Sequence, residues 1–211
     1  MLRVGLIGWR GMVGSVLLER MRQEGDFAGL EPIFFSTSNV GGAAPKEAGD
    51  SAVLEDARNL RELAACEILV SCQGGEYTTE IYAPLRKSGW QGYWIDAAST
   101  LRMSDDAVIV LDPVNANVIE QGLSRRLRTF AGGNCTVSLM LMAVSSLFQA
   151  GLVEWMTTMT YQAASGSGAA KMLELVKQME FLTDSTRKTP SENALEVDRM
   201  VIGAQRARSL P

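Results

Sequence analysis

The segment that most constrains the fold of this chain lies at its amino terminus. Residues 2–7 have the apolar character of a short strand and lead directly into a turn with glycines at positions 8, 11 and 14. Apolar residues then recur at helical spacing, namely Val13, Val16, Leu17, Leu18 and Met21. A strand, a glycine turn and a helix in this order predict a dinucleotide-binding unit, because glycines let the backbone approach a pyrophosphate and the helix amino terminus supplies N–H donors. The spacing G-x-x-G-x-x-G is a weak signature by itself, and a glycine turn with no nucleotide would give the same pattern.

The residues after the second predicted strand indicate which dinucleotide would bind. An NAD site usually carries an acid about 20 residues beyond the glycines, where it binds the ribose 2′-hydroxyl. Residues 32–38 predict a strand that ends in Thr37 and Ser38 with no acid, and Arg10 in the glycine turn offers a guanidinium suited to phosphate. We therefore predict NADP as the cofactor, although solvated hydroxyls and a surface arginine would give the same sequence pattern.

A cysteine stands at the start of another predicted helix. Gly132 and Gly133 precede Asn134 and Cys135, and residues 139–144 are apolar. A cysteine at a helix amino terminus can become a nucleophilic thiolate, because exposed N–H groups and the helix dipole stabilise the anion and lower the thiol pKa below its free value of about 8.5. Cys135 is therefore a candidate nucleophile, and a small buried cysteine without chemistry is the alternative interpretation.

Strands and helices alternate along the first part of the chain. Short strands are predicted near residues 67–72, 93–97, 107–111 and 128–131, with a helix over 78–87. This order predicts an α/β fold with a Rossmann-like, doubly wound parallel sheet and helices on both of its faces. After Cys135 the pattern predicts a helix, a strand over 155–163, a glycine loop and a helix over 171–179. We interpret these as the opening elements of a second domain.

Composition limits the functional classes that need considering. The 211 residues carry a net charge of −4 and a sequence pI of about 5.0, which gives no support for nucleic-acid binding. No apolar run reaches the roughly 18 residues of a membrane span, and the first residues lack a secretory apolar core. The three cysteines show neither a disulfide framework nor metal-ligand spacing. We expect a reduced, cytoplasmic protein with no metal site.

Five segments together resemble bacterial aspartate-semialdehyde dehydrogenase. They are residues 8–15, 71–75, 89–99, 132–142 and 161–166, and the resemblance extends to at least Gln178. It loosens over residues 181–187 and returns weakly around 189–190 and 195–199. The chain ends at Pro211, whereas members of this family continue.

The resemblance implies an NADPH-dependent reductive dephosphorylation of L-4-aspartyl phosphate to L-aspartate 4-semialdehyde, a step of lysine, threonine and methionine biosynthesis. The reaction would pass through a thioester on the active-site cysteine. The resemblance also implies an NADP-binding domain over residues 1–133, followed over residues 134–211 by an incomplete α+β catalytic and dimerisation domain. The partners that the resemblance implies for this chain are the small-molecule substrates and a second copy of the chain in a homodimer.

The matching motifs imply roles for individual residues. Cys135 would be the nucleophile, and Asn134 beside it would orient the acyl oxygen. Arg102 corresponds to the arginine that binds the acyl phosphate or inorganic phosphate, and Gln162 corresponds to a position that contacts substrate. The implied cofactor site comprises Arg10, Gly11, Met12, Val13, Thr37, Ser38 and Gln73, together with Ser165, Gly166 and Gly168 from a later glycine loop. Thr100 stands where serine is usual and Ser167 interrupts a glycine run, and neither small residue argues against binding.

One catalytic group of the family has no counterpart in this chain. The family uses a histidine as proton acceptor, and the 211 residues contain no histidine. The residues that bind the amino-acid end of the substrate lie, in the family, beyond the position of Pro211. Two hypotheses therefore stand: an enzyme of this activity, and a truncated, non-catalytic NADP-binding pseudoenzyme or partner-dependent fragment. A strand over 155–163 without its neighbours would also leave unpaired backbone groups for a partner chain to cover.

Overall fold

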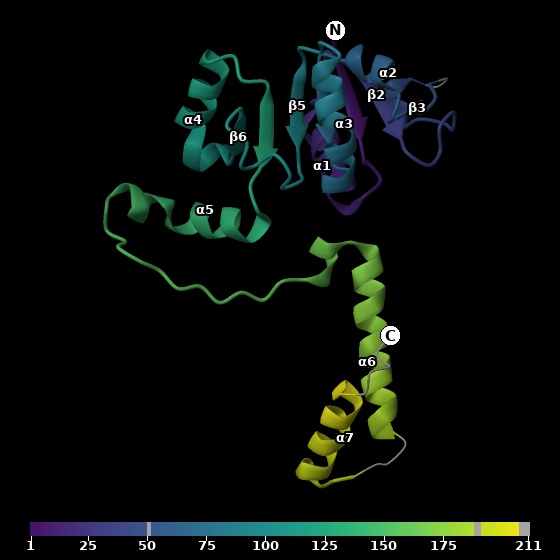
Figure 1. Ribbon diagram of the computed structural model, residues 1–211, viewed down its shortest axis with the longest axis vertical. Helices are drawn as coiled ribbons and strands as arrows, with labels where there is room; N and C mark the ends of the chain where they lie inside the picture. The colour runs from purple at the N-terminus through teal and green to yellow at the C-terminus, as the bar shows by residue number, and fades with distance from the viewer. Residues whose placement is uncertain (50–51, 188–190, 207–211) are drawn as a thin grey trace. The chain divides into compact units, whose positions relative to one another are not determined.

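The computed structural model of the protein describes residues 1–49, 52–187 and 191–206. The chain divides into two compact units, Met1–Thr157 and Thr158–Pro211, and each is described by itself (Figure 1). The domain boundary predicted after residue 133 stays a prediction.

The first unit is built on a parallel sheet. Within the described residues it has seven strands in the order β3-β2-β1-β4-β5-β7-β6, and every neighbouring pair is parallel. The strands are β1 Leu2–Ile7, β2 Leu30–Ser36, β3 Glu55–Asp56, β4 Ile68–Ser71, β5 Tyr93–Asp96, β6 Ala107–Val110 and β7 Thr129–Gly132. The chain runs outward from β1 to β2 and β3 and then crosses to β4 on the other side of β1, which creates a topological switch point between β1 and β4. The predicted doubly wound parallel sheet is confirmed.

Local signals account for several helix ends in this unit. The helices are α1 Met12–Glu24, α2 Leu60–Ala64, α3 Gly75–Lys87, α4 Asp112–Ser124 and α5 Cys135–Gln149, with a short 3-10 helix, η1, at Lys46–Ala48. Gly25 ends α1 in the left-handed conformation with a φ of 75°, which a glycine adopts without strain. Asn59 begins α2 by accepting a hydrogen bond from the backbone N–H of Arg61.

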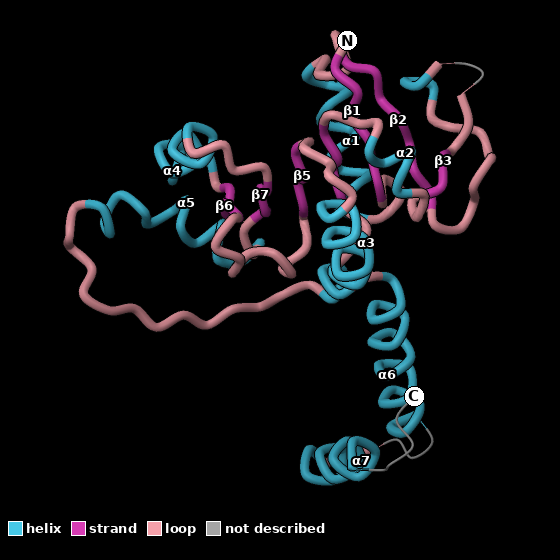
Figure 2. Tube along the Cα trace, turned by 45° about the horizontal axis from the view of Figure 1, so that its top comes forward, coloured by secondary structure: helices cyan, strands magenta, loops and turns pink. Residues whose placement is uncertain are grey.

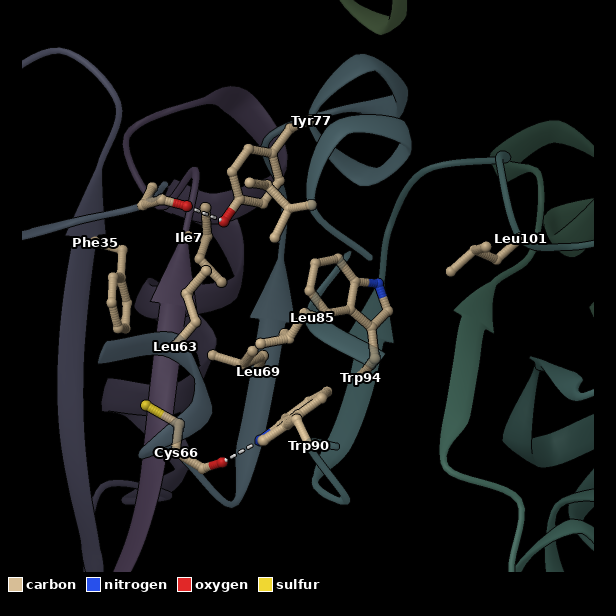
Figure 3. Packing of buried hydrophobic residues seen from close by; sticks show 12 residues of the cluster. Ile7, Phe35, Leu63, Cys66, Leu69, Tyr77, Leu85, Trp90, Trp94 and Leu101 are labelled. Carbon is tan, nitrogen blue, oxygen red and sulfur yellow. Dashed lines mark hydrogen bonds between the residues drawn. The ribbon is translucent and has the colours of Figure 1, made fainter. Parts of the chain in front are cut away.

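The largest apolar cluster lies where α3 packs on the sheet (Figure 3). Its members include Ile7, Phe35, Leu63, Leu69, Tyr77, Ile81, Leu85, Trp90, Trp94 and Leu101. Each fully buried side chain of this size stabilises the fold by about 1.5–3 kcal/mol. The polar atoms of two buried aromatic side chains form hydrogen bonds. The Tyr77 hydroxyl donates to the carbonyl of Ala57 at 2.7 Å, and the Trp90 indole N–H donates to the carbonyl of Cys66 at 2.8 Å. A second cluster lies under α1 and consists of Val4, Leu6, Leu18, Phe34 and Leu54.

The face of the sheet that carries α1 has an apolar groove in its middle, which we call the β4–β5 groove. Val13 and Leu17 of α1 line one part and Leu123 of α4 another, and Val70 and Ile95 contribute from β4 and β5. The groove has a volume of about 620 Å3. Parallel sheets are normally covered on both faces, and Ile95 is 39% exposed although it lies in a central strand. The groove therefore leaves an apolar part of a central strand uncovered.

The second unit consists of helices and loops in its described residues. It contains the 3-10 helix η2 Ala164–Ser167 and the helices α6 Ala169–Arg187 and α7 Ala194–Arg206, and α6 packs against α7. The helix predicted over residues 171–179 is confirmed as part of the longer α6. In the parts of the chain that the structure describes, no helix combines the length and apolar character needed to cross a membrane.

The strand predicted over residues 155–163 is wrong. These residues form neither helix nor strand and are drawn as loop in Figure 2. An alternating sequence becomes a strand only when a neighbour accepts and donates its backbone hydrogen bonds, and no described strand pairs with this segment. The apolar side of the alternation is consequently not buried: Trp155 is 77% exposed and Tyr161 is 96% exposed.

Candidate active site

Two glycines shape the turn between β1 and α1. Gly8 has a φ of +72°, and a Cβ there would lie 2.5 Å from backbone atoms of Cys72 and Gln73. A Cβ on Gly14 would collide with the carbonyl oxygen of Gly8 and the backbone of Trp9. Because neither position has room for a side chain, α1 begins close to the end of β1, and the unpaired N–H groups of its first turn lie at the switch point.

A polar pocket of about 320 Å3 lies beside this turn, at the carboxyl ends of β1, β2 and β4. Its lining includes five of the residues predicted for the cofactor site: Arg10, Gly11, Thr37, Ser38 and Gln73. Met12 is the exposed first residue of α1, and Val13 lines the β4–β5 groove instead. The structure thus brings five of the seven cofactor-site residues predicted in this unit into one pocket, at the position where doubly wound sheets bind nucleotides.

Arg10 provides the positive charge of the polar pocket. Its Nη2 donates to Ser36 Oγ at 3.1 Å and to Ser38 Oγ at 3.2 Å, and its guanidinium lies 5.5 Å from the centre of the Trp9 ring. No carboxylate forms an ion pair with Arg10 in the described part of the chain. Neutral hydroxyls therefore orient the guanidinium and leave its positive charge unpaired by any described carboxylate. This arrangement fits a bound phosphate.

Cys135 lies at the first position of α5, as predicted. Asn134 is the N-cap, and its Oδ1 accepts a hydrogen bond from the backbone N–H of Val137 at 3.1 Å. The thiol is exposed, and its Sγ lies 3.9 Å from Thr136 Oγ1. Gly133 allows this close turn because a Cβ there would lie 2.5 Å from the Ser138 hydroxyl. The sulfur is therefore accessible beside the positive end of a helix.

Arg102 forms hydrogen bonds that hold the turn preceding Cys135. Its Nε donates to the carbonyl of Gly132 at 2.7 Å, and its Nη2 donates to the carbonyls of Gly133 at 3.2 Å and Ala97 at 3.4 Å. The guanidinium thereby joins the end of β7 to the turn after β5. No hydrogen bond of Nη1 occurs among the described residues, so one edge of the guanidinium can receive an anion. The predicted role in phosphate binding stays a prediction.

The other two thiols lie in different surroundings. Burial raises the pKa of Cys66 to about 11, and burial together with the nearby negative charge of Asp96 raises the pKa of Cys72 to about 11. Desolvation disfavours a thiolate at both positions. Cys135 is the exposed cysteine of the chain, and its thiol is the one that a substrate in solution could reach.

The remaining predicted site residues belong to the second unit. Gln162 precedes η2 and is exposed, and Ser165 and Gly166 lie within η2. Gly168 ends η2 with a φ of +88°, a conformation that favours glycine. Their roles in cofactor or substrate binding stay predictions.

Sequence reasoning missed three residues that the structure places at the site. Ser36 is buried and accepts hydrogen bonds from Arg10 and from the backbone N–H of Asn39, and Trp9 lines the polar pocket. Asp96 is a buried carboxylate at the end of β5. Ser36 was detectable as a hydroxyl directly before Thr37 and Ser38. A single acid within an apolar strand gives no such periodic signal.

The parallel sheet, the glycine turn and the polar pocket at the switch point define a dinucleotide-binding domain of the Rossmann type. Residues 3–122 match a family described as semialdehyde dehydrogenase, NAD binding domain, and residues 144–206 match one described as semialdehyde dehydrogenase, dimerisation domain. The chain belongs to the semialdehyde dehydrogenase family.

Solved structures refine this assignment. The chain is 47% identical to aspartate semialdehyde dehydrogenase from Francisella tularensis, with a TM-score of 0.86, over 96% of this chain and 55% of that one. It is 25% identical to aspartate semialdehyde dehydrogenase II from Vibrio cholerae complexed with ASA, with a TM-score of 0.68, over 92% of this chain and 55% of that one. Aspartate semialdehyde dehydrogenase with NADP from Candida albicans shares the fold at 15% identity and a TM-score of 0.54, over 72% of this chain and 48% of that one. The chain resembles bacterial aspartate-semialdehyde dehydrogenase and spans about half the length of these relatives.

Proposed function

We propose that this chain carries the cofactor pocket and the nucleophile of an NADPH-dependent aspartate-semialdehyde dehydrogenase. The observation that carries the proposal is the exposed Cys135 at the first position of α5, in a turn fastened by Arg102. The identity of 47% to the Francisella protein supports the choice of substrate. The proposed reaction converts L-4-aspartyl phosphate into L-aspartate 4-semialdehyde.

Cys135 would act as a covalent nucleophile. Its Sγ adds to the acyl carbon of aspartyl phosphate, the bond from that carbon to the phosphate oxygen breaks, and inorganic phosphate leaves with the bonding electrons. The chain then carries a thioester on Cys135. Asn134 would orient the acyl oxygen through its amide, and the free edge of Arg102 would bind the departing phosphate. In the reverse direction phosphate would cleave the same thioester.

The polar pocket fits an adenine dinucleotide phosphate. The glycine turn leaves no room for side chains where the pyrophosphate would meet the first N–H groups of α1, and Arg10 with Ser38 would bind the 2′-phosphate. When bound, NADPH supplies the hydride that reduces the thioester carbon. We propose that Ser165, Gly166 and Gly168 add contacts from the second unit, and that Gln162 contacts the substrate.

A second candidate function rests on the amino-acid composition. Aldehyde release and thioester formation need a proton donor and acceptor near operating pH, and the 211 residues contain no histidine. A non-catalytic NADP-binding protein, or a fragment that needs a partner to supply this group, is therefore the alternative. Residues 144–206 match a dimerisation domain, and we propose that they mediate a homodimer.

A coupled measurement separates the two candidates. The chain is supplied with aspartate semialdehyde, phosphate and NADP+, and NADPH formation is followed by absorbance, while NADPH binding is followed by fluorescence. Turnover that Cys135→Ala abolishes and Cys66→Ala retains supports the enzyme. NADPH binding without turnover supports the second candidate, and a chain that does not bind NADPH contradicts both.

A further inference from the structure

A buried carboxylate lies between the two halves of the candidate active site. Asp96 is the last residue of β5 and is 1% exposed. Its Oδ2 accepts hydrogen bonds from Thr78 Oγ1 at 2.7 Å and Trp94 Nε1 at 3.1 Å, and its Oδ1 accepts one from the backbone N–H of Ala98 at 2.8 Å. No cation pairs with it among the described residues. A buried carboxylate without a cation costs folding free energy, so stability alone does not account for an acid at this position.

On one side, Asp96 holds the start of α3 beside the polar pocket. Its partner Thr78 lies in the first turn of α3, which begins two residues after Gln73 of that pocket. Thr100 Oγ1, from the turn after β5, donates to the carbonyl of Gly75 at 3.3 Å. A Cβ on Gly75 would lie 2.7 Å from that hydroxyl, so the two segments pack closely. The carboxylate therefore fixes the turn after β5 against the loop that lines the cofactor pocket.

On the other side, Asp96 holds the segment to which Arg102 is attached. Its bond to Ala98 orders the backbone directly beside Ala97, whose carbonyl accepts from Arg102. Leu101, next to Arg102, is buried in the cluster that contains Trp94 (Figure 3). Arg102 in turn binds the carbonyls of Gly132 and Gly133, just before the cap of α5. A continuous set of hydrogen bonds thus leads from Thr78 through Asp96 and Arg102 to the Cys135 turn.

We propose that Asp96 is a positioning residue that holds the Cys135 turn and the cofactor pocket in a fixed relation. It touches neither substrate nor cofactor and acts through Thr78, the turn at residues 97–102 and Arg102. This inference rests on the proposed function for the meaning of the geometry, because a fixed relation matters only if Cys135 reacts beside the cofactor. The geometric effect itself can be measured without turnover.

The test uses the rate of Cys135 alkylation by iodoacetamide in the ligand-free chain near pH 7.5, with the label located by peptide mass spectrometry. Thr78→Val removes the donor to Asp96 at nearly constant shape, and Thr78→Ser keeps it. Asp96→Asn removes the charge and one acceptor. We expect Asp96→Asn and Thr78→Val to slow alkylation about 5-fold, because the turn before α5 would be held less firmly and the Cys135 sulfur would spend less time in its exposed position at the first residue of α5. Thr78→Ser should react at the unmodified rate.

A destabilised control separates positioning from general loss of structure. Leu63→Ala creates a cavity in the apolar cluster away from the Cys135 turn, and it should lower the Tm without changing the alkylation rate. Equal rates in Thr78→Val and Thr78→Ser, or an equal slowing in Leu63→Ala, would overturn the inference. If Asp96→Asn does not fold, the Thr78 pair decides. Protection of Cys135 by saturating NADPH in the unmodified chain is measured in parallel, and its absence would count against the proposed function while leaving the alkylation comparison valid.

Discussion

The three thiols differ in their surroundings, and this difference can be tested residue by residue. Burial raises the pKa of Cys66 and of Cys72 to about 11, so near pH 8 only about one in a thousand of either group is thiolate. Cys135 is exposed. Limited alkylation near pH 8 should therefore label Cys135 first, as found by peptide mass spectrometry, and Cys135→Ala should remove the fast phase. Labelling that begins at Cys72 would contradict this order.

Arg10 gives a second test at the residue scale. Because its charge meets hydroxyls and no carboxylate, Arg10→Ala should weaken NADPH binding about 10-fold, as expected for a lost charge-assisted contact. NADH has no 2′-phosphate, and its affinity should stay unchanged. Fluorescence titration measures both affinities. Arg20→Ala serves as the control, because Arg20 is an exposed arginine farther along α1 and pairs with Glu24. Equal affinities of the unmodified chain for the two cofactors would argue against the proposed role of Arg10.

The residues of the site differ in how far the sequence alone could identify them. Arg10, Thr37 and Ser38 were predicted because an arginine stands in the glycine turn and the second predicted strand ends in hydroxyls where an NAD site usually carries an acid. Cys135 was predicted because two glycines precede it and an apolar run at residues 139–144 follows it, whereas the role of Asn134 as the N-cap became evident only in the structure. Asp96 was not predicted, since its importance depends on partners 18 residues away at Thr78 and on contacts through Arg102 that no local pattern contains.

At the scale of secondary-structure elements, one ion pair joins α1 to η1. Arg22 Nε lies 2.7 Å from Glu47 Oε1, and the Glu47 side chain is only 8% exposed. The hydrogen bond from Arg22 holds the pKa of Glu47 below its usual value, so the ionised acid stabilises the fold above the unfolded-state pKa. That contribution is lost as the pH falls through the lowered pKa.

Glu47→Gln tests this contact. Because Arg22 is partly exposed, we expect a loss of about 0.5–1 kcal/mol in the free energy of unfolding near pH 7, and a smaller loss near pH 3, below the unfolded-state pKa. Urea denaturation at the two pH values measures the effect. Glu31→Gln removes a carboxylate from a pair with Arg3 in which both side chains are largely exposed, and it should change stability little at either pH. A loss for Glu47→Gln that is as large near pH 3 as near pH 7 would refute the assignment.

The elements that sequence reasoning mispredicted have identifiable physical causes. Six of the seven strands were predicted because each is a short, largely apolar run between turn residues, whereas β3 was missed because it consists of only Glu55 and Asp56. α4 was missed, and its Asn115 has a non-helical φ of −134°, so the local pattern is interrupted within the element. The strand predicted over 155–163 was wrong because alternation specifies which side chains share a face, whereas pairing requires a neighbouring strand.

At the scale of the whole molecule, the accessibility of the β4–β5 groove to an apolar probe can be measured. Its lining is apolar, and Ile95 is accessible within it. An apolar dye such as anilinonaphthalene sulfonate should bind the folded chain there and fluoresce. Ile95→Thr keeps the β-branched shape but adds a hydroxyl, and it should reduce the fluorescence by about half or more. Val40→Thr changes an exposed apolar residue elsewhere and should have no effect, and equal losses in both variants would show that the dye binds at another place.

The close approach of α1 to the end of β1 also affects how such a protein can diverge. Any substitution of Gly8 or Gly14 adds a Cβ where backbone atoms already lie, so we expect neither position to tolerate another residue. Arg10 and Met12, a few residues away, are exposed and carry little of the packing. Because we propose that Arg10 contributes to NADPH preference, we expect substitutions at the exposed positions to change coenzyme binding while the domain stays folded. A saturation library measured first for protein abundance and then for coenzyme binding should show the two constraints at separate sets of positions.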